Sequence, residues 1–221
     1  MHPMKVIVIG GTGATGRALV DKLIETPWVK EIVVLVRRNS FKQHPKLRQE
    51  IVDFNELDNS SQHIKGEIAF SCLGTTLKIA GSKEAQWVID HDYQYNFGKL
   101  CNSNGISTFV LLSALNANDK SSSFYGKMKG VLEKNISELD FNKLVIIRPS
   151  LLIRPGSSRA LEKIGVKFML LCNKIGLGKA FAPLEVSTVA EAMMKSSVHD
   201  KTSKTILEVS EIIKIAQKSR Q

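Results

Sequence analysis

The sequence predicts an α/β fold in which helices cover both faces of a doubly wound, mostly parallel β-sheet. Short runs of β-branched residues alternate with longer segments of helical periodicity, as they do when parallel strands are joined by helical crossovers. The runs are continuously apolar, which is typical of strands that are covered on both faces. A chain of 221 residues with 43% hydrophobic residues is long enough to bury one such core.

The first half of the chain supplies four expected strands and one helix. Residues 5–9 are short, β-branched and followed by Gly10, so they predict a buried strand. A helix is expected over residues 14–25, because Pro27 lies just beyond its end. The next strands are expected at residues 32–36, 50–52 and 68–72.

The alternation continues as far as Pro149. Residues 83–104 have helical content and end before Gly105, a residue type suited to a helix C-cap. The remaining elements of this part are a strand at 108–112, a helix at 123–139 and a strand at 144–147.

The regular alternation of strands and helices ends at Pro149. Apolar residues recur at steps of three and four between residues 161 and 175, with lysines off that stripe. The pattern predicts a helix packed on the core or over the cofactor cleft; the alternative is a helix that binds a membrane surface or a partner. A last helix is expected from Ser187, a reasonable N-cap, to residue 194, and a final strand at 205–209. We expect one domain over residues 1–221, in which residues 150–183 form a substrate-pocket or lid segment.

Composition narrows the class of protein. The net charge of +10 favours anionic partners, although the basic residues are scattered as on an ordinary solvated surface. The three cysteines, without a CxxC pair, argue against a disulfide framework and for a reducing compartment, so a cytoplasmic location is expected. The histidines have no metal-ligand spacing, and no metal is expected. We expect no signal peptide, because residues 5–10 lead straight into glycines, with no small-residue cleavage site after a long apolar stretch. We expect no transmembrane segment, because no apolar run approaches the roughly 20 residues that span a bilayer.

A glycine-rich turn follows the first expected strand. Its sequence, GGTGATG, has a GxxGxxG pattern and opens the first expected helix. Glycines let the backbone approach a pyrophosphate, and a helix N-terminus offers free N–H groups and a partial positive charge. In this context the pattern predicts a Rossmann-type, dinucleotide-binding fold rather than a plain tight turn. The residues of the turn expected to bind the cofactor are Gly10, Thr12, Gly13, Ala14, Thr15 and Gly16.

The end of the second expected strand favours NADPH over NADH. An acidic residue there would bind the ribose hydroxyls of NAD, but this chain has Arg37 and Arg38. A guanidinium suits a 2′-phosphate and can stack on adenine, although two arginines after a strand can also be ordinary surface residues. Asp53 and Phe54 follow the third strand and are expected to border the adenine. The central portion of the cofactor is expected to be lined by the residues that follow the fourth strand, Cys72, Leu73 and Gly74.

Tyr125 and Lys129 are candidate catalytic residues, because a spacing of four places them on one face of a helix. A nearby ammonium lowers the pKa of a tyrosine, which can then exchange a proton with a carbonyl or an alcohol near neutral pH. Ser113, at the end of the fifth strand, is expected to hydrogen-bond the same oxygen. The alternative for Tyr125 and Lys129 is that they are an ordinary pair of exposed residues on a helix surface. Tyr95 and Lys99 repeat the spacing but precede that strand, so a surface-pair or packing role is the better interpretation for them.

Together these features resemble the short-chain dehydrogenase/reductase superfamily, and more narrowly its atypical branch around the Tat-interacting-protein oxidoreductases. The similarity spans about residues 4–195 and includes the segments CLGTT (72–76), DHDY (90–93), LLSALNANDKSSSFYGKMKGVLE (111–133) and RPSLL (148–152). The resemblance implies an NADPH-binding Rossmann domain with a Ser-Tyr-Lys site at positions 113, 125 and 129. It also implies that Lys129 holds the nicotinamide ribose and that the segment after Arg-Pro shapes the substrate pocket. Ser150 departs from the glycine that usually follows Arg-Pro in this branch.

The leading hypothesis is an NADPH-dependent reductase of a small carbonyl compound, with Tyr125 as proton donor, Lys129 tuning it and Ser113 orienting the oxygen. The alternative is a non-catalytic NADPH-binding redox sensor, as in related proteins of the NmrA-like type, which would bind another protein or a nucleic acid. A third possibility is a non-redox reaction, such as epimerisation, on a structural cofactor. No helix-turn-helix, zinc or RNA-binding signature is evident, so specific nucleic-acid recognition is not expected. The sequence identifies neither the substrate nor the oligomeric state.

Overall fold

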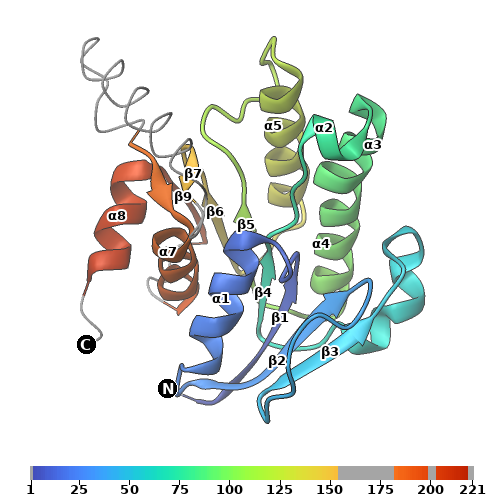
Figure 1. The fold of residues 1–221 in the computed structure, drawn as a ribbon, viewed down its shortest axis with the longest axis vertical. Coiled ribbons are helices and arrows are strands. Elements are labelled where there is room, and N and C mark those ends of the chain that lie inside the picture. Colours follow the sequence, from blue (N-terminus) through green and yellow to red (C-terminus); the bar gives the residue numbers. More distant parts are fainter. Residues whose placement is uncertain (1, 154–181, 199–202, 219–221) are drawn as a thin grey trace.

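The computed structural model describes residues 2–153, 182–198 and 203–218 of the chain. Within them, seven parallel strands form one sheet in the order β3-β2-β1-β4-β5-β6-β9 (Figure 1). The strands are β1 (Met4–Ile9), β2 (Val29–Val36), β3 (Leu47–Ile51), β4 (Ile68–Ser71), β5 (Thr108–Leu112), β6 (Lys143–Ile147) and β9 (Lys204–Leu207). The chain winds from β1 outward to β3 and returns to the other side of β1 with β4, which confirms the doubly wound fold. A separate parallel pair is formed by β7 (Leu152–Ile153) and β8 (Leu184–Glu185).

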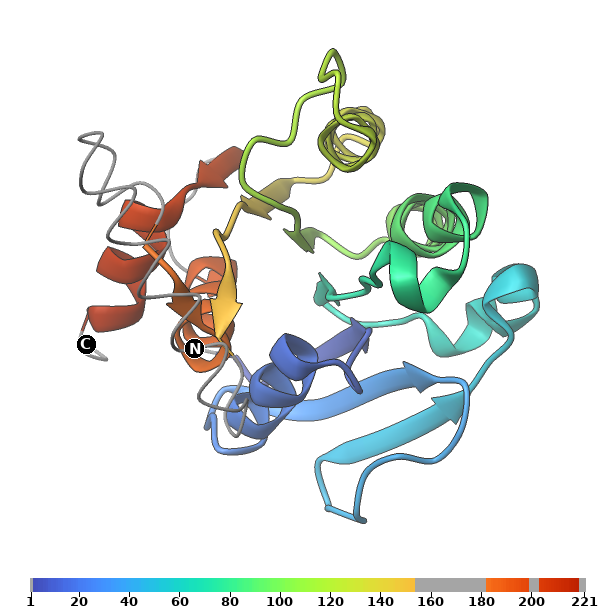
Figure 2. The ribbon, with the colours of Figure 1, turned by 45° about the horizontal axis from the view of Figure 1, so that its top comes forward.

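Helices cover both faces of the sheet (Figures 1 and 2). One face carries α1 (Ala14–Ile24), α7 (Val186–Val198) and α8 (Val209–Gln217), and the other carries α4 (Tyr93–Ser103) and α5 (Phe124–Ser137). Side chains of a strand point alternately to the two faces, so each strand serves both hydrophobic layers. In β1, Val8 packs into the layer that includes α1 and α7, whereas Ile7 and Ile9 pack into the layer that includes α4 and α5.

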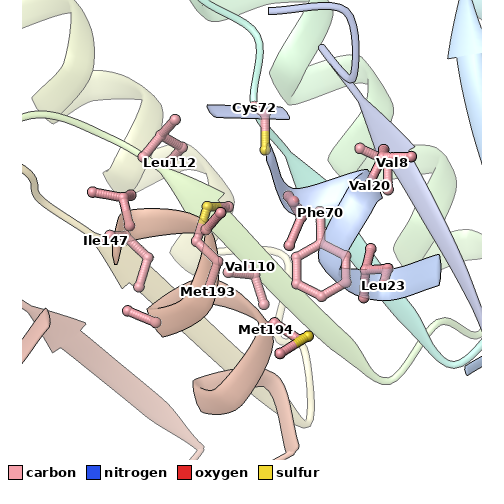
Figure 3. Packing of buried hydrophobic residues seen from close by; sticks show 14 of the residues in the cluster. Val8, Val20, Leu23, Phe70, Cys72, Val110, Leu112, Ile147, Met193 and Met194 are labelled. Atoms are coloured by element: carbon pink, nitrogen blue, oxygen red, sulfur yellow. The ribbon is translucent and has the colours of Figure 1, made fainter. Parts of the chain in front are cut away.

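The layer beneath α1 and α7 is drawn in Figure 3. Met193 and Met194 of α7 reach the strand residues Val110 and Phe70, all of them at most 3% exposed. Burying such side chains is worth roughly 1.5–3 kcal/mol each, so this packing holds α7 against the sheet. At the carboxyl ends of β4 and β5 this layer includes Cys72 and Leu112, which also line the cavity at that edge of the sheet.

The strands and helices expected before Pro149 are present, with ends shifted by a few residues. The helix expected over 83–104 is interrupted, because α3 (Lys83–Trp87) passes into α4 through a π-helical turn, η2 (Val88–Asp92). Gly105 has a φ of +77°, as expected for a residue after a helix. The sequence analysis missed two short elements, the 3₁₀ segment η1 (Phe54–His63) and the helix α2 (Leu77–Ala80).

The last expected helix and strand are present as α7 and β9, but one predicted boundary of each is wrong. Ser187 is not an N-cap, because α7 already begins at Val186, and the Ser187 hydroxyl donates to the Glu185 carboxylate at 3.1 Å. The strand expected over 205–209 ends at Leu207, because Glu208 and Glu211 form a capping box that starts the unexpected helix α8. The apolar stripe over 161–175 lies outside the described residues.

Within the described ranges there is neither a helix long and apolar enough to cross a membrane nor a group of three or more His, Cys, Asp or Glu side chains placed to hold a metal ion. Cys72 and Cys101 are free and buried. Burial raises the pKa of the Cys72 thiol to about 12, so this thiol stays protonated and unreactive at neutral pH. Cys172 lies outside the part of the chain that the structure describes.

Candidate cofactor and active site

The glycine-rich turn connects β1 to α1 and lies against the end of β4. Gly10 has a φ of +71°, and a Cβ atom there would overlap the backbone of Cys72. A Cβ atom on Gly16 would overlap the carbonyl group of Gly10. Both positions therefore require glycine for the turn to pack this closely on β4 and on its own helix.

The N-terminus of α1 presents backbone N–H groups that no side chain caps. Its N-cap is Gly13, which supplies no side-chain hydrogen bond, and its first turn contains no acidic residue. The amides of the first turn remain available to an anion at the positive end of the helix. A dinucleotide diphosphate fits this arrangement, because the glycines leave room for it and the amides can donate to its oxygens.

A cavity of about 610 Å³ opens at this edge of the sheet. It is bounded by the start of α1, by the segments that follow β4, β5 and β6, and by the first turns of α5. Its described lining comprises residues 13–15, 72–76, Ile79, 112–116, Tyr125, Lys129 and 149–152. Lys129 is the one charged side chain in this described lining.

The cavity brings together most of the site residues that the sequence predicts. Its lining includes Gly13, Ala14, Thr15, Cys72, Leu73, Gly74, Ser113, Tyr125 and Lys129. Gly10 and Gly16 form the turn behind this lining, and Thr12 is exposed on the same turn. Tyr95 and Lys99 are not in the lining; the Lys99 ammonium lies 5.3 Å from the Tyr95 ring centre, which agrees with a packing role on α4.

The two arginines predicted to select the cofactor lie at the end of β2, outside the cavity lining. Arg37 and Arg38 are exposed and directly follow the strand. A third arginine, missed by the sequence analysis, comes from α1: Arg17 stacks 4.7 Å from the ring centre of Phe41 and donates to the carbonyl of Ser40 at 3.3 Å. Basic side chains from two elements therefore flank the loop after β2.

Asp53 and Phe54, expected to border the adenine, point in different directions. Asp53 is exposed, and its carboxylate accepts the backbone N–H of Asn55 at 2.8 Å as the cap of η1. Phe54 is 6% exposed, and its ring centre lies 5.6 Å from that of Tyr93 within the core. Asp53, and not the ring of Phe54, is thus at the surface beside the end of β3.

One face of α5 carries three functional groups in successive turns. Tyr125, Lys129 and Glu133 are spaced by four residues, and Ser123 caps the helix by accepting the N–H of Gly126 at 3.1 Å. Tyr125 is 43% exposed at the cavity mouth, whereas Lys129 is only 2% exposed and Glu133 6%. The helix therefore leads from the partly exposed Tyr125 to a buried ammonium and a buried carboxylate.

The expected lowering of the tyrosine pKa is wrong for this structure. Desolvation raises the pKa of Tyr125 to about 12, and the negative charge of Asp90 acts in the same direction. Burial also lowers the pKa of Lys129, against the opposing effects of Asp90 and Glu133. At neutral pH Tyr125 is consequently a phenol, suited to giving a proton rather than to taking one.

Ser113 lines the cavity, but its hydroxyl already has an acceptor. Its Oγ donates to Oε1 of Glu133, which also accepts Nε of Arg148 at 3.0 Å. Arg148 Nη2 donates to the other carboxylate oxygen of Glu133, so the ion pair is bidentate. In this arrangement Ser113 can accept a hydrogen bond from a ligand, whereas donation to a substrate oxygen requires its hydroxyl to turn away from Glu133.

Two buried acids were not predicted from the sequence: Glu133 on α5 and Asp90 on η2. Both lie in segments that the sequence analysis singled out by resemblance, DHDY and the stretch ending in GVLE. The signal that could have identified Glu133 is its spacing, one helical turn after Lys129 on the same face, whereas Asp90 lies among polar residues that give no such signal.

Comparison with known proteins gives a family and a fold. A profile described as "NAD dependent epimerase/dehydratase family" matches residues 6–144. Protein HTATIP2 of Rattus norvegicus is 33% identical over 176 residues, which cover 75% of this chain and 72% of that protein. "Protein FMP52, mitochondrial" of Saccharomyces cerevisiae is 33% identical over 157 residues, 68% of this chain and 66% of the relative.

Solved structures with little sequence similarity share the architecture. WbmH of Bordetella bronchiseptica, in complex with NAD+, superimposes with a TM-score of 0.70 at 14% identity, covering 92% of this chain and 75% of that one. A UDP-N-acetylglucosamine 4-epimerase from Methanobrevibacter ruminantium superimposes with a TM-score of 0.68 at 15% identity, covering 97% of this chain and 81% of the other.

Proposed function

This chain belongs to the NAD dependent epimerase/dehydratase family, and from that premise we propose that it is an oxidoreductase that binds NADPH and reduces a small carbonyl compound. The observation that carries the proposal is the single cavity in which the open N-terminus of α1, Tyr125 and Lys129 meet. The amides at the start of α1 would hold the diphosphate of a nicotinamide dinucleotide, and Tyr125 and Lys129 line the same cavity. The NAD complexes of structural neighbours such as WbmH support the class of cofactor.

The preference for NADPH rests on the charges beside β2. Arg37 and Arg38 follow the strand, and Arg17 faces the next loop, so a 2′-phosphate would meet guanidinium groups. Replacing Arg37 and Arg38 together by serine is expected to weaken NADPH binding roughly ten- to a hundredfold, the loss of one or two charge-assisted hydrogen bonds. Binding of NADH should stay unchanged in a fluorescence titration, as should both affinities in the matched surface variant Arg48→Ser. Equal losses for the two nucleotides would contradict the preference.

The residues of the cavity have distinct roles in the proposed reaction. When bound, the nicotinamide supplies a hydride, with its electron pair, to the carbonyl carbon. Tyr125 donates its phenolic proton to the carbonyl oxygen, which completes the alcohol, and it then regains a proton from water. Lys129 holds positive charge beneath the phenol and stabilises the transient phenolate, and Ser113 orients the oxygen.

The surroundings of Tyr125 favour an uncharged, apolar substrate. Ile79 is 77% exposed and Leu151 is 42% exposed, and both line the cavity. A substrate body that covers these side chains removes apolar surface from water. Neutral aliphatic or aromatic carbonyl compounds are therefore the first panel to assay.

Tyr125→Phe tests the catalytic assignment. We expect it to lower NADPH-dependent turnover by about 10² to 10⁴, the usual contribution of a positioned proton donor, while NADPH affinity changes less than about twofold. Tyr95→Phe, which removes a hydroxyl outside the cavity lining, is the control and should keep full turnover. Full activity of Tyr125→Phe on a substrate of the wild-type protein would refute the role.

A non-catalytic NADPH sensor is the second candidate, and one observation favours it: the hydroxyl of Ser113 is engaged by Glu133. Saturable NADPH binding without NADPH consumption on any carbonyl would support this candidate. A third outcome, substrate conversion without net NADPH consumption, would indicate epimerisation. The cytoplasmic location stays a prediction, since FMP52 relatives carry the word mitochondrial in their names.

A further inference from the structure

Asp90 is a buried acid to which the proposed reaction gives no role. It lies in the π-helical turn η2 and is fully buried. Its Oδ1 accepts the backbone N–H of Thr75 at 2.7 Å, and its Oδ2 accepts the side-chain amide of Gln86 at 3.3 Å. Thr75 belongs to the cavity wall that follows β4, so this carboxylate holds the wall from behind.

Asp90 and Lys129 are buried in elements that pack against each other, η2 and α5, and Lys129 lines the same cavity as Thr75. Each of the two groups perturbs the other electrostatically, and the charge of Asp90 also acts on Tyr125. Yet the described structure contains no ion pair within 4 Å between Asp90 and a cationic side chain. Asp90 therefore acts on its neighbours through the low-dielectric interior without being neutralised by direct contact.

The second acid that acts on Lys129, Glu133, already has a cationic partner. Glu133, one turn further along α5, is held in the bidentate ion pair with Arg148. Asp92, the other acid of η2, has a half-exposed side chain that contacts Nδ1 of His91 at 2.7 Å. Asp90 is thus the carboxylate near Lys129 that has no cationic partner of its own among the described residues.

We propose that Asp90 is a positioning residue that keeps the buried Lys129 protonated and Tyr125 in its phenol form, and so directs the site towards proton donation. The effect on the charge of Lys129 stands on this structure alone, whereas the consequence for catalysis rests on the proposed function. Asp90 acts through Lys129 and Tyr125 and needs no contact with substrate or cofactor. Gln86, 4% exposed, supports it by holding the second carboxylate oxygen.

The test is the titration of Lys129 in the full-length protein, without cofactor. The probe is the ¹³Cε resonance of Lys129 in ¹³C-lysine-labelled protein, assigned by its loss in Lys129→Arg. Asp90→Asn should lower the pKa of Lys129 by about one unit or more, the effect of removing a nearby opposite charge. Asp92→Asn, which removes the neighbouring acid of the same turn, is the control and should leave that pKa within about 0.3 unit.

A charge swap separates charge from structure. The double variant Asp90→Asn with Gln86→Glu keeps an amide–carboxylate hydrogen bond between the two positions but moves the negative charge to residue 86. The double variant should restore at least half of the Lys129 pKa decrease seen in Asp90→Asn. A purely structural role of Asp90 predicts that the pKa stays low. An unchanged Lys129 pKa in folded Asp90→Asn would overturn the proposal.

If neither variant folds, a titration of the wild-type protein tests the proposal. The ¹³Cγ titration of Asp90 must then be mirrored in the ¹³Cε shift of Lys129, and an independent titration of the two groups would overturn the proposal. If the Lys129 pKa shifts as expected while no carbonyl compound is reduced by any form of the protein, the proposed function fails and the electrostatic role of Asp90 stands.

Discussion

The two buried carboxylates near the cavity, Glu133 on α5 and Asp90 on η2, differ in how their charge is compensated. Glu133 is locked to Arg148 by two hydrogen bonds and also receives the hydroxyl of Ser113. The Asp90 carboxylate is held by neutral donors, the amides of Thr75 and Gln86, and forms no ion pair within 4 Å among the described residues. An acid that is neutralised by contact contributes mainly to the integrity of the fold, whereas an acid left without a contact partner stays available to tune the groups of a site.

Breaking the Glu133 pair should have the largest effect on stability. Arg148→Met leaves a buried carboxylate without its partner, and we expect a loss of about 3 kcal/mol in the free energy of unfolding, measured by urea denaturation. Arg48→Met, which breaks a more exposed ion pair with Glu50, is the matched control and should cost less than about 1 kcal/mol. Similar losses of unfolding free energy in the two variants would contradict a structural role of the Glu133–Arg148 pair.

Neutralising Glu133 without removing its shape should cost less. Glu133→Gln keeps an oxygen that can accept from Arg148 and Ser113, but the charge-assisted hydrogen bonds become neutral ones. We expect a loss of about 1–2 kcal/mol in the free energy of unfolding. A loss larger than that of Arg148→Met would mean that the acid, and not the pair, stabilises this part of the molecule.

Neutralising Asp90 should have the smallest effect on stability and a distinctive pH dependence. Burial raises the pKa of Asp90 above its ordinary value of 3.8, so the folded state binds this proton more readily than the unfolded state. The contribution of Asp90 to stability is therefore present below that value and is lost as the pH rises through the folded-state pKa. Unfolding free energies of Asp90→Asn and wild type should thus converge in acid, and the variant should gain relative to wild type as the pH rises towards neutral. If the wild type instead became more stable relative to the variant as the pH rises, the raised pKa assigned to Asp90 would be contradicted.

The rate of carbonyl reduction should depend very little on pH near neutrality. Because the pKa of Tyr125 is raised to about 12, its phenol stays protonated, and turnover should be constant within about twofold between roughly pH 6 and 8. Loss of turnover across this range with an apparent pKa near 7 would indicate a different proton donor. Stopped-flow measurement of NADPH oxidation at saturating substrate provides the profile.

The sequence predicts the fold well because its signals are local. Continuous apolar runs indicate where the strands lie. Gly10 and Gly16, which no other residue could replace, indicate the turn between the first strand and the first helix. Capping is also local, but the box formed by Glu208 and Glu211 lies directly after an expected strand, and the sequence analysis did not recognise it. The short pair of β7 and β8 depends on residues far apart in the chain, so no local pattern indicates it.

The site could be predicted only in part from the sequence. Spacing and chain order pick out Tyr125 and Lys129, and the structure brings both to one cavity with the glycine turn. The direction of the Tyr125 pKa shift could not be obtained in this way, because it is set by burial and by Asp90, a residue distant in sequence. The engagement of Ser113 by Glu133 likewise depends on the packing of α5 against β5 and β6.

The measurement that tests the central claim most directly is a titration of the purified protein with NADPH and with NADH, followed by nicotinamide fluorescence. We predict saturable binding of one NADPH per chain, tighter than that of NADH and retained in Tyr125→Phe. The absence of saturable binding for both nucleotides would contradict the assignment of the glycine turn and its cavity as a dinucleotide site.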